Sequence, residues 1–216
     1  YCHLISGAMD NAIGYMNKYI RIIVHICALL PLLTLFWDLR FDNLSVNPIQ
    51  DITFRTGKPA LILLVLVLSI TPLRKWFGLH SLIQFRKMLG LYAFMYASLH
   101  FLVFVGLDYG FDIELLRSSV FKKPYVVLGF LAYLTLVPLA ITSTRGWIRR
   151  LGKYWKLLHR LVYLTGILAI AHYIWAVKSD IRQPLLFAVV TCVLLLARIP
   201  IFNRTIHSLR EKLTSK

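Results

Sequence analysis

Long apolar runs dominate this chain and limit what it can fold into. Six segments contain at most one Lys, Arg, Asp or Glu each: Ile20–Trp37, Pro59–Leu73, Met88–Leu107, Pro124–Thr142, Leu157–Val177 and Leu185–Phe202. A helix of about 20 apolar residues crosses a bilayer, whose interior admits only helices and closed barrels. The pattern therefore predicts an all-α membrane protein, a six-transmembrane helix bundle. The second run is short unless its helix begins before Lys58 and Arg55, whose side chains can reach the interface.

Lys and Arg residues are concentrated in the loops on one side of the membrane that these runs would cross. The net charge is +16, although only 16% of residues are charged. With the N-terminus in the cytoplasm, 17 of the 25 Lys and Arg residues and two of the nine acidic residues fall on that side, a net charge of +15 against +1 outside. This positive-inside pattern predicts that both termini are cytoplasmic. A nucleic-acid-binding patch would not alternate with each apolar segment, so no nucleic-acid partner is expected.

The segments outside the bundle are short. We expect an N-terminal tail at 1–19, a six-span domain at 20–202 and a basic cytoplasmic tail at 203–216. Residues 1–15 differ in composition from the rest of the chain, and Met16 resembles a natural start, so we expect an extension or a disordered tail there. The loop Asp108–Lys123 has acidic residues early and basic residues late, which predicts a short interfacial helix. The sequence has no glycine-rich dinucleotide fingerprint, so electron donors or acceptors are expected to be separate molecules.

Two histidines fall at a similar depth in two different runs. His100 is in the outer half of the third span and His172 in the outer half of the fifth. Ionisable residues inside a bilayer are costly and mark functional sites. A pair at matched depth can supply both axial ligands of one haem iron between helices. The alternative is that each histidine makes an interhelical hydrogen bond.

A third histidine, His159, lies 13 positions before His172, about 20 Å along a helix. It is therefore expected near the cytoplasmic face, as a ligand of a second haem or as part of an aromatic belt beside Trp155. Thirteen residues rotate an ideal helix by about 220°, so the two rings share a face only if the helix bends. Gly166 lies between them and would allow a kink.

The sequence offers no obvious second ligand for an inner haem bound by His159. Positions 13 and 14 before His100 hold Lys87 and Arg86. Arg86 is better suited to bind a haem propionate or another anion, and His25 is a second candidate for the inner partner. No hydrolytic motif or paired carboxylates occur in the spans, so no catalytic residues are assigned.

Three tracts together carry a family resemblance: LGLYAFMYASLH, TSTRGWIRRLGKYWKLLHRLVYL and AHYIWAVKSD. With six spans and histidines on the third and fifth, the chain from Tyr19 to Phe202 resembles the ferric-reductase-like transmembrane family. The resemblance implies one or two b-type haems with His100, His159 and His172 at ligand positions. Arg86 departs from the pattern, because two-haem relatives have a histidine there.

Further tracts, DITFRTGKPAL, SITPL and YWKLLHRLVYL, resemble the members of that family that are haem-binding membrane subunits of methionine sulfoxide reductase systems. This resemblance implies a protein of the bacterial inner membrane with associated FMN. It would take electrons from the quinone pool or a flavin reductase and pass them to a periplasmic molybdopterin methionine sulfoxide reductase, without being the catalytic subunit. Two alternatives stay open: a stand-alone ferric or dioxygen reductase, and a non-redox transporter or scaffold.

Overall fold

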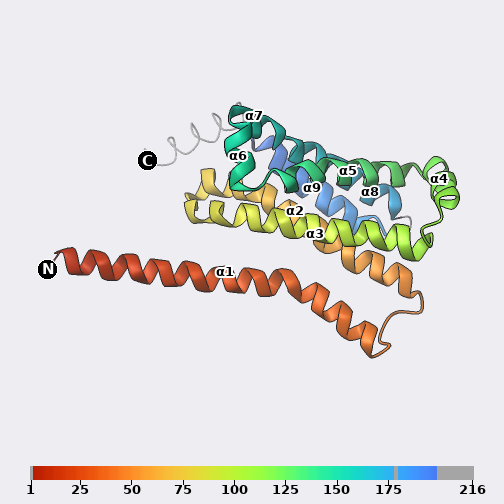
Figure 1. Cartoon of the computed structure of the whole chain (residues 1–216), viewed down its shortest axis with the longest axis horizontal. Helices are drawn as coiled ribbons and strands as arrows, with labels where there is room; N and C mark the ends of the chain where they lie inside the picture. Colours follow the sequence, from red (N-terminus) through yellow and green to blue (C-terminus); the bar gives the residue numbers. More distant parts are fainter. Residues whose placement is uncertain (1, 178–179, 199–216) are drawn as a thin grey trace. The chain divides into compact units, whose positions relative to one another are not determined.

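The computed structural model describes residues 2–177 and 180–198, with the side chains of 2–17 and of Phe121 excepted. Every regular element in this part of the chain is a helix (Figure 1): α1 Cys2–Arg40, α2 Pro48–Phe77, a 3-10 helix His80–Phe85, α3 Arg86–Val103, a π-helix Phe104–Asp108, α4 Ile113–Lys122, α5 Pro124–Ile141, α6 Arg145–Leu151, α7 Lys153–Leu158, α8 Leu161–Ala176 and α9 Arg182–Leu196. The all-α prediction is confirmed for these residues. The chain divides into two compact units, Tyr1–Arg55 and Thr56–Lys216.

Five helical segments are long and apolar enough to cross a membrane: Lys18–Arg40, Pro48–Phe77, His80–Asp108, Pro124–Ile141 and Lys153–Ala176. The sixth predicted span is only partly described, because α9 has 15 residues and the chain beyond Arg198 lies outside the described part. The predicted tail at 203–216 lies outside it entirely. Large apolar side chains such as Leu102, Leu131, Ile167 and Val189 are exposed, as expected for surfaces that face lipid.

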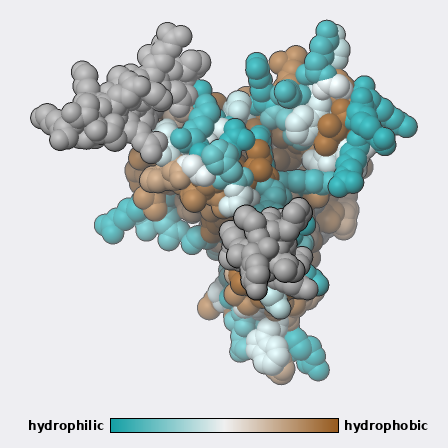
Figure 2. All heavy atoms as spheres, turned by 90° about the vertical axis from the view of Figure 1, so that its left-hand side faces the viewer, coloured by the Kyte–Doolittle hydropathy of each residue, from teal (hydrophilic) through white to brown (hydrophobic). Residues whose placement is uncertain are grey.

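Hydrophilic side chains gather at the end of the second unit where α6 and α7 lie (Figure 2). The exposed basic residues on these two short helices are Arg145, Arg149, Arg150, Lys153 and Lys156. At the opposite end of this unit lies α4 (Figure 1). The N-terminus of α4 is capped by Asp112, whose carboxylate accepts from the backbone N–H groups of Glu114 and Leu115. The predicted helix in the loop Asp108–Lys123 is thus present, with an acidic first turn and a basic last turn that suit the helix dipole.

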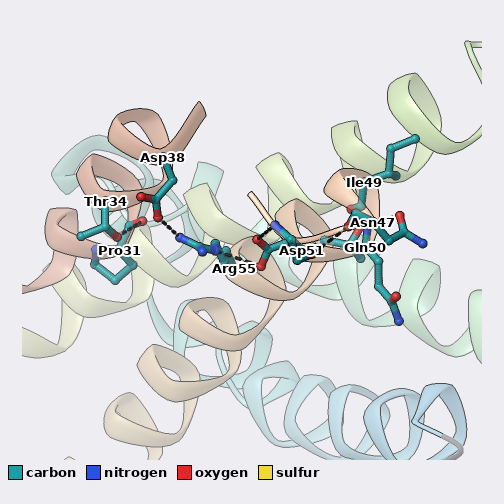
Figure 3. Close-up of polar contacts among 10 residues, drawn as sticks. Pro31, Thr34, Asp38, Asn47, Ile49, Gln50, Asp51 and Arg55 are labelled. Carbon is teal, nitrogen blue, oxygen red and sulfur yellow. Dashed lines mark hydrogen bonds and ion pairs between the residues drawn. The ribbon is translucent and has the colours of Figure 1, made fainter. Parts of the chain in front are cut away.

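In the first unit, an arginine is held between two carboxylates (Figure 3). Arg55 Nη1 pairs with Asp38 Oδ2 near the end of α1, and Arg55 Nε donates to Asp51 Oδ1 at 2.9 Å. Two acceptors compensate the guanidinium charge, so α2 can begin at Pro48 rather than at the expected Pro59. The second span therefore does extend back past Arg55 and is not short.

The segment 2–15 is helical and continuous with the first span in α1. The structure thus differs from the disordered tail that the composition suggested. That this segment is an extension stays a prediction.

In the second unit, α5 and α8 pack together along most of their length. Thr135 Oγ1 of α5 and Thr165 Oγ1 of α8 are 2.7 Å apart, and Thr165 is fully buried. A Cβ on Gly166 would lie 3.1 Å from Leu68 Cδ1, so this glycine allows close approach of α2. Small and hydroxyl residues at such contacts are typical of membrane helix pairs.

The regular helix of the fifth span is interrupted, but not at Gly166. Gly166 lies inside the regular helix α8, whereas α7 ends at Leu158 and α8 begins at Leu161. Between them the backbone forms i→i+3 hydrogen bonds, from Arg160 N to Leu157 O and from Tyr163 N to Arg160 O. The interruption therefore falls at His159 itself, within a tightened turn.

Arg198, just after the end of α9, donates hydrogen bonds to α2 and α8. Pro72 has no N–H, so the Leu68 carbonyl lacks its usual donor four residues later in α2. Arg198 Nη2 donates to that carbonyl at 2.6 Å, and Arg198 Nη1 donates to Tyr163 Oη of α8 at 2.7 Å. The missing N–H donor of Pro72 is thus replaced by a side-chain donor that follows another helix.

Candidate functional site

The side chains of His100 on α3 and His172 on α8 are neighbours in the second unit. Their ring centroids are 6.2 Å apart and the ring planes make an angle of 79°. Both side chains are partly buried. The two histidines predicted to share a depth are therefore neighbours, although 72 positions separate them in the chain.

His172 is anchored through one ring nitrogen. Its Nδ1 lies 2.7 Å from the backbone carbonyl oxygen of Tyr125 on α5. A carbonyl can only accept, so Nδ1 carries the proton and Nε2 keeps its lone pair. Gly129 of α5 faces the same edge of the ring, where an added Cβ would lie 2.8 Å from Nδ1. A ligand histidine in a metalloprotein is held in the same way, with the second nitrogen donating to a carbonyl.

His100 is held in a similar manner by α2. Its Nδ1 is 3.5 Å from Thr56 Oγ1, and Thr56 is buried. A Cβ on Gly57 would lie 2.9 Å from the same nitrogen. On both histidines the edge that carries Nδ1 thus faces a glycine on a neighbouring helix.

The pair fits the two axial positions of a haem. Imidazole–metal bonds are about 2 Å long and each ring nitrogen lies about 1 Å from its centroid, so two coaxial imidazoles on one metal have centroids about 6 Å apart. The observed 6.2 Å agrees with this value. In the part of the chain that the structure describes, no group of three His, Cys, Asp or Glu side chains is arranged to hold a bare metal ion. A metal bound by this pair needs other ligands, which a porphyrin supplies.

His159 has a different environment. Thr142 Oγ1 donates to Pro138 O at 2.6 Å, so it accepts from His159 Nε2 at 3.2 Å. The Trp155 ring lies 4.0 Å from the His159 ring, and Trp155 Nε1 donates to Thr142 O at 2.9 Å. These contacts fix the turn between α7 and α8 against the end of α5. They engage His159 Nε2 with a hydroxyl group rather than leave it facing another histidine.

A cavity of about 340 Å³ opens beside His159. Its polar lining comes from Arg86, Lys87, Ser143, Trp155 and His159, and its walls are mostly apolar residues of α2, α3 and α5. Arg86 is partly buried, and the ion pairs found among the described side chains are both made by Arg55. The cavity therefore presents cationic groups next to an aromatic ring, which suits a planar ligand that bears an anionic group.

The remaining histidines have other environments or fall outside the described side chains. His25 has an exposed side chain on α1 in the first unit, whereas the site is built from the second unit. His80 is exposed, and its Nδ1 is 2.7 Å from the Gly78 carbonyl oxygen in its own turn. The side chains of His3 and His207 lie outside the described residues.

Four residues that touch the histidine pair did not emerge from the sequence: Thr56, Gly57, Tyr125 and Gly129. Glycines in apolar helices often mark close approaches, so Gly57 and Gly129 carried a usable signal. The Tyr125 contact uses a backbone carbonyl, which no side-chain pattern could indicate.

The sequence also matches known proteins. Residues 23–170 match the family described as ferric reductase like transmembrane component. A relative from Xanthomonas campestris pv. campestris (strain 8004) is 48% identical over 179 residues, covering 80% of this chain and 82% of the relative. One from Herminiimonas arsenicoxydans is 46% identical over 183 residues, covering 83% and 84%. Both are named protein-methionine-sulfoxide reductase heme-binding subunit MsrQ. No solved structure matches the chain.

Proposed function

The chain belongs to the ferric reductase-like transmembrane family and to its MsrQ haem-binding subunits, and from this premise we propose that it is a b-type haem electron-transfer subunit. It carries electrons across the bacterial inner membrane to a periplasmic methionine sulfoxide reductase that repairs oxidised proteins. The observation that carries the proposal is the pair His100 and His172, with rings 6.2 Å apart. Haem, when bound, supplies the one-electron couple of its iron.

The protein's own residues set the position and environment of that haem. Nε2 of His100 and of His172 are the proposed axial ligands. The hydrogen bond from His172 Nδ1 to the Tyr125 carbonyl fixes the ring and makes Nε2 a better donor to iron. Apolar helices around the pair exclude water and keep the local dielectric low.

The cavity beside His159 is the proposed second cofactor site. It holds either a second haem, with His159 as a ligand and Arg86 on a propionate, or the redox ring of the donor. Arg86 and Lys87 would bind the anionic arm of that group, and Trp155 would cover its ring. A quinone or FMN is the donor class that the relationship to MsrQ favours. His25 stays a weaker candidate for the inner haem partner.

The orientation follows from the charge distribution. We place both termini and the basic α6–α7 end in the cytoplasm, and α4 and the His100–His172 pair toward the periplasm. Electrons would then enter beside His159 and leave beside His100 and His172. The electron acceptor would be a separate protein, most simply a molybdopterin reductase, because the described outer segments bear no set of residues arranged for catalysis.

Reporter fusions test this orientation. Fusions after Leu107 and after Val177 are expected to report the periplasm, and a fusion after Leu151 the cytoplasm, because basic loops resist translocation. Alkaline phosphatase and a fluorescent protein that folds only in the cytoplasm give opposite signals for each junction. The reverse pattern at all three junctions would contradict the orientation and the direction of electron flow.

The haem proposal is tested by an optical spectrum of the full chain purified in detergent. We expect a Soret band together with α and β bands that sharpen on reduction by dithionite, as for a low-spin haem with two imidazole ligands. Extraction of the pigment as free haem would identify it as b-type. A protein that is folded and colourless after growth with added haem precursor would contradict the proposal.

A second candidate function is a stand-alone reductase of ferric ions or dioxygen that uses a separate flavoprotein donor. The family description, ferric reductase like, is the observation that favours it. The two functions share the haem and differ in the acceptor, so an assay with defined acceptors separates them.

A further inference from the structure

We infer that Gly57 and Gly129 are positioning residues for the two haem ligands, each forming a side-chain-free seat against which one imidazole rests. The inference rests on the proposed haem function and adds residues that act on the ligands without touching the metal. It is carried by two contacts of the same kind on two different helices. Gly57 faces His100, and Gly129 faces His172.

The contacts leave no room for a side chain. A Cβ on Gly129 would lie 2.8 Å from His172 Nδ1 and 2.9 Å from Cε1. A Cβ on Gly57 would lie 2.9 Å from His100 Nδ1 and 3.0 Å from Cε1. All four distances are far inside carbon–nitrogen or carbon–carbon contact, which is optimal near 3.5–4.0 Å. Alanine at either position therefore requires the ring or the helix to move.

At Gly129 the missing side chain also uncovers a hydrogen-bond acceptor. A helical Cβ points toward the N-terminus of the helix, over the carbonyl four residues earlier. For residue 129 that carbonyl is Tyr125, which accepts from His172 Nδ1 at 2.7 Å. A methyl group at 129 would crowd this hydrogen bond, so Gly129 fixes both the place of the ring and its tautomer.

The two seats determine how far apart the imidazoles can stand. Each ring is held by its Nδ1 edge at the backbone of a neighbouring helix, α2 for His100 and α5 for His172. The positions of the α2 and α5 backbones therefore determine the spacing of 6.2 Å between the ring centroids. A shift of either ring by about the radius of a methyl group would displace its Nε2 relative to a shared metal, which weakens the axial bond.

The test compares Gly57→Ala and Gly129→Ala with a matched control, Gly146→Ala. Gly146 is also helical, and the nearest heavy atom to its added Cβ is Thr144 Oγ1 at 4.0 Å, an ordinary contact. Each full-length variant is purified in detergent, depleted of haem and titrated with haem. We expect both seat variants to bind haem about 10- to 100-fold more weakly, the range for lost outer-shell support of a metal ligand. We expect the control to match the parent.

Two further readouts separate positioning from general packing. Any haem retained by the seat variants is expected to show an altered low-spin electron paramagnetic resonance signal and a shifted reduction potential. In the haem-free state their helical melting temperatures should be no lower than that of the control, because an untethered imidazole can rotate away. If haem affinity, resonance signal and potential match the parent, or if the haem-free melting temperature falls along with haem affinity, the inference is wrong. A colourless parent would remove both this inference and the proposed function, whereas a coloured parent with unaffected variants removes this inference alone.

Discussion

Replacing either His100 or His172 by alanine is expected to remove the same haem signal. One haem held by two axial imidazoles loses half of its protein ligation in each variant, and the open iron is retained weakly. The two rings lie 6.2 Å apart, so the variants act on one metal rather than on two. The measurement is the haem-to-protein ratio together with the reduced α band and the low-spin resonance of each purified variant. Near-complete loss of that resonance is expected in both.

His80→Ala is the matched control, because His80 is exposed and is engaged with the Gly78 carbonyl in its own turn. It should retain the parent spectrum. His159→Ala is expected to change a different signal, or to lower haem content separately, since His159 lies against Thr142 and the cavity rather than against the pair. An intact low-spin spectrum in His100→Ala would show that the pairing is wrong.

The helical spans could be predicted because membrane thickness imposes one length on every crossing segment. Three apolar runs coincide closely with α3, α5 and α7–α8, and a fourth lies inside the longer α1. The start of α2 could not be predicted from hydropathy, because Arg55 and Asp51 count as polar residues when taken alone. Their contact with each other and with Asp38 compensates these charges, and the Asn47 side chain accepts from Gln50 N at the start of the helix.

The candidate ligand histidines could be predicted from the sequence, but the residues that hold their rings in place could not. Histidines in apolar runs can be recognised in the sequence, because placing an ionisable side chain inside a membrane costs free energy and marks functional sites. The helix interruption at His159 had no local signal, because it is accompanied by hydrogen bonds from Trp155 and His159 to Thr142, at the end of another helix. The seats at Gly57 and Gly129 depend on a ring 43 positions away in each case. Contacts of that kind are set by helix packing, which a single sequence does not specify.

Rapid oxidation of the reduced protein by methionine sulfoxide is expected only when a partner reductase is present. Methionine sulfoxide is returned to methionine by a dedicated reductase. The described outer segments, including α4, offer no set of residues that could bind that side chain and reduce it. In the proposed function the histidine pair holds a haem that passes electrons outward, and it does not itself break a sulfur–oxygen bond. In the proposed function this chemistry takes place on a separate reductase, and the relatives are named as heme-binding subunits of protein-methionine-sulfoxide reductase.

The experiment uses full-length protein in liposomes, reduced and then followed at the α band. Methionine sulfoxide alone should oxidise it slowly, and addition of a purified MsrP-like reductase to the side that exposes α4 should increase the rate at least tenfold. The reductase without its molybdopterin is the control and should have no effect, because docking alone accepts no electrons. Addition to the opposite side should also be without effect, since the accepting face is not exposed there. Fast oxidation by ferric chelates or dioxygen, with no response to the reductase, would contradict the electron-transfer role and favour the stand-alone reductase.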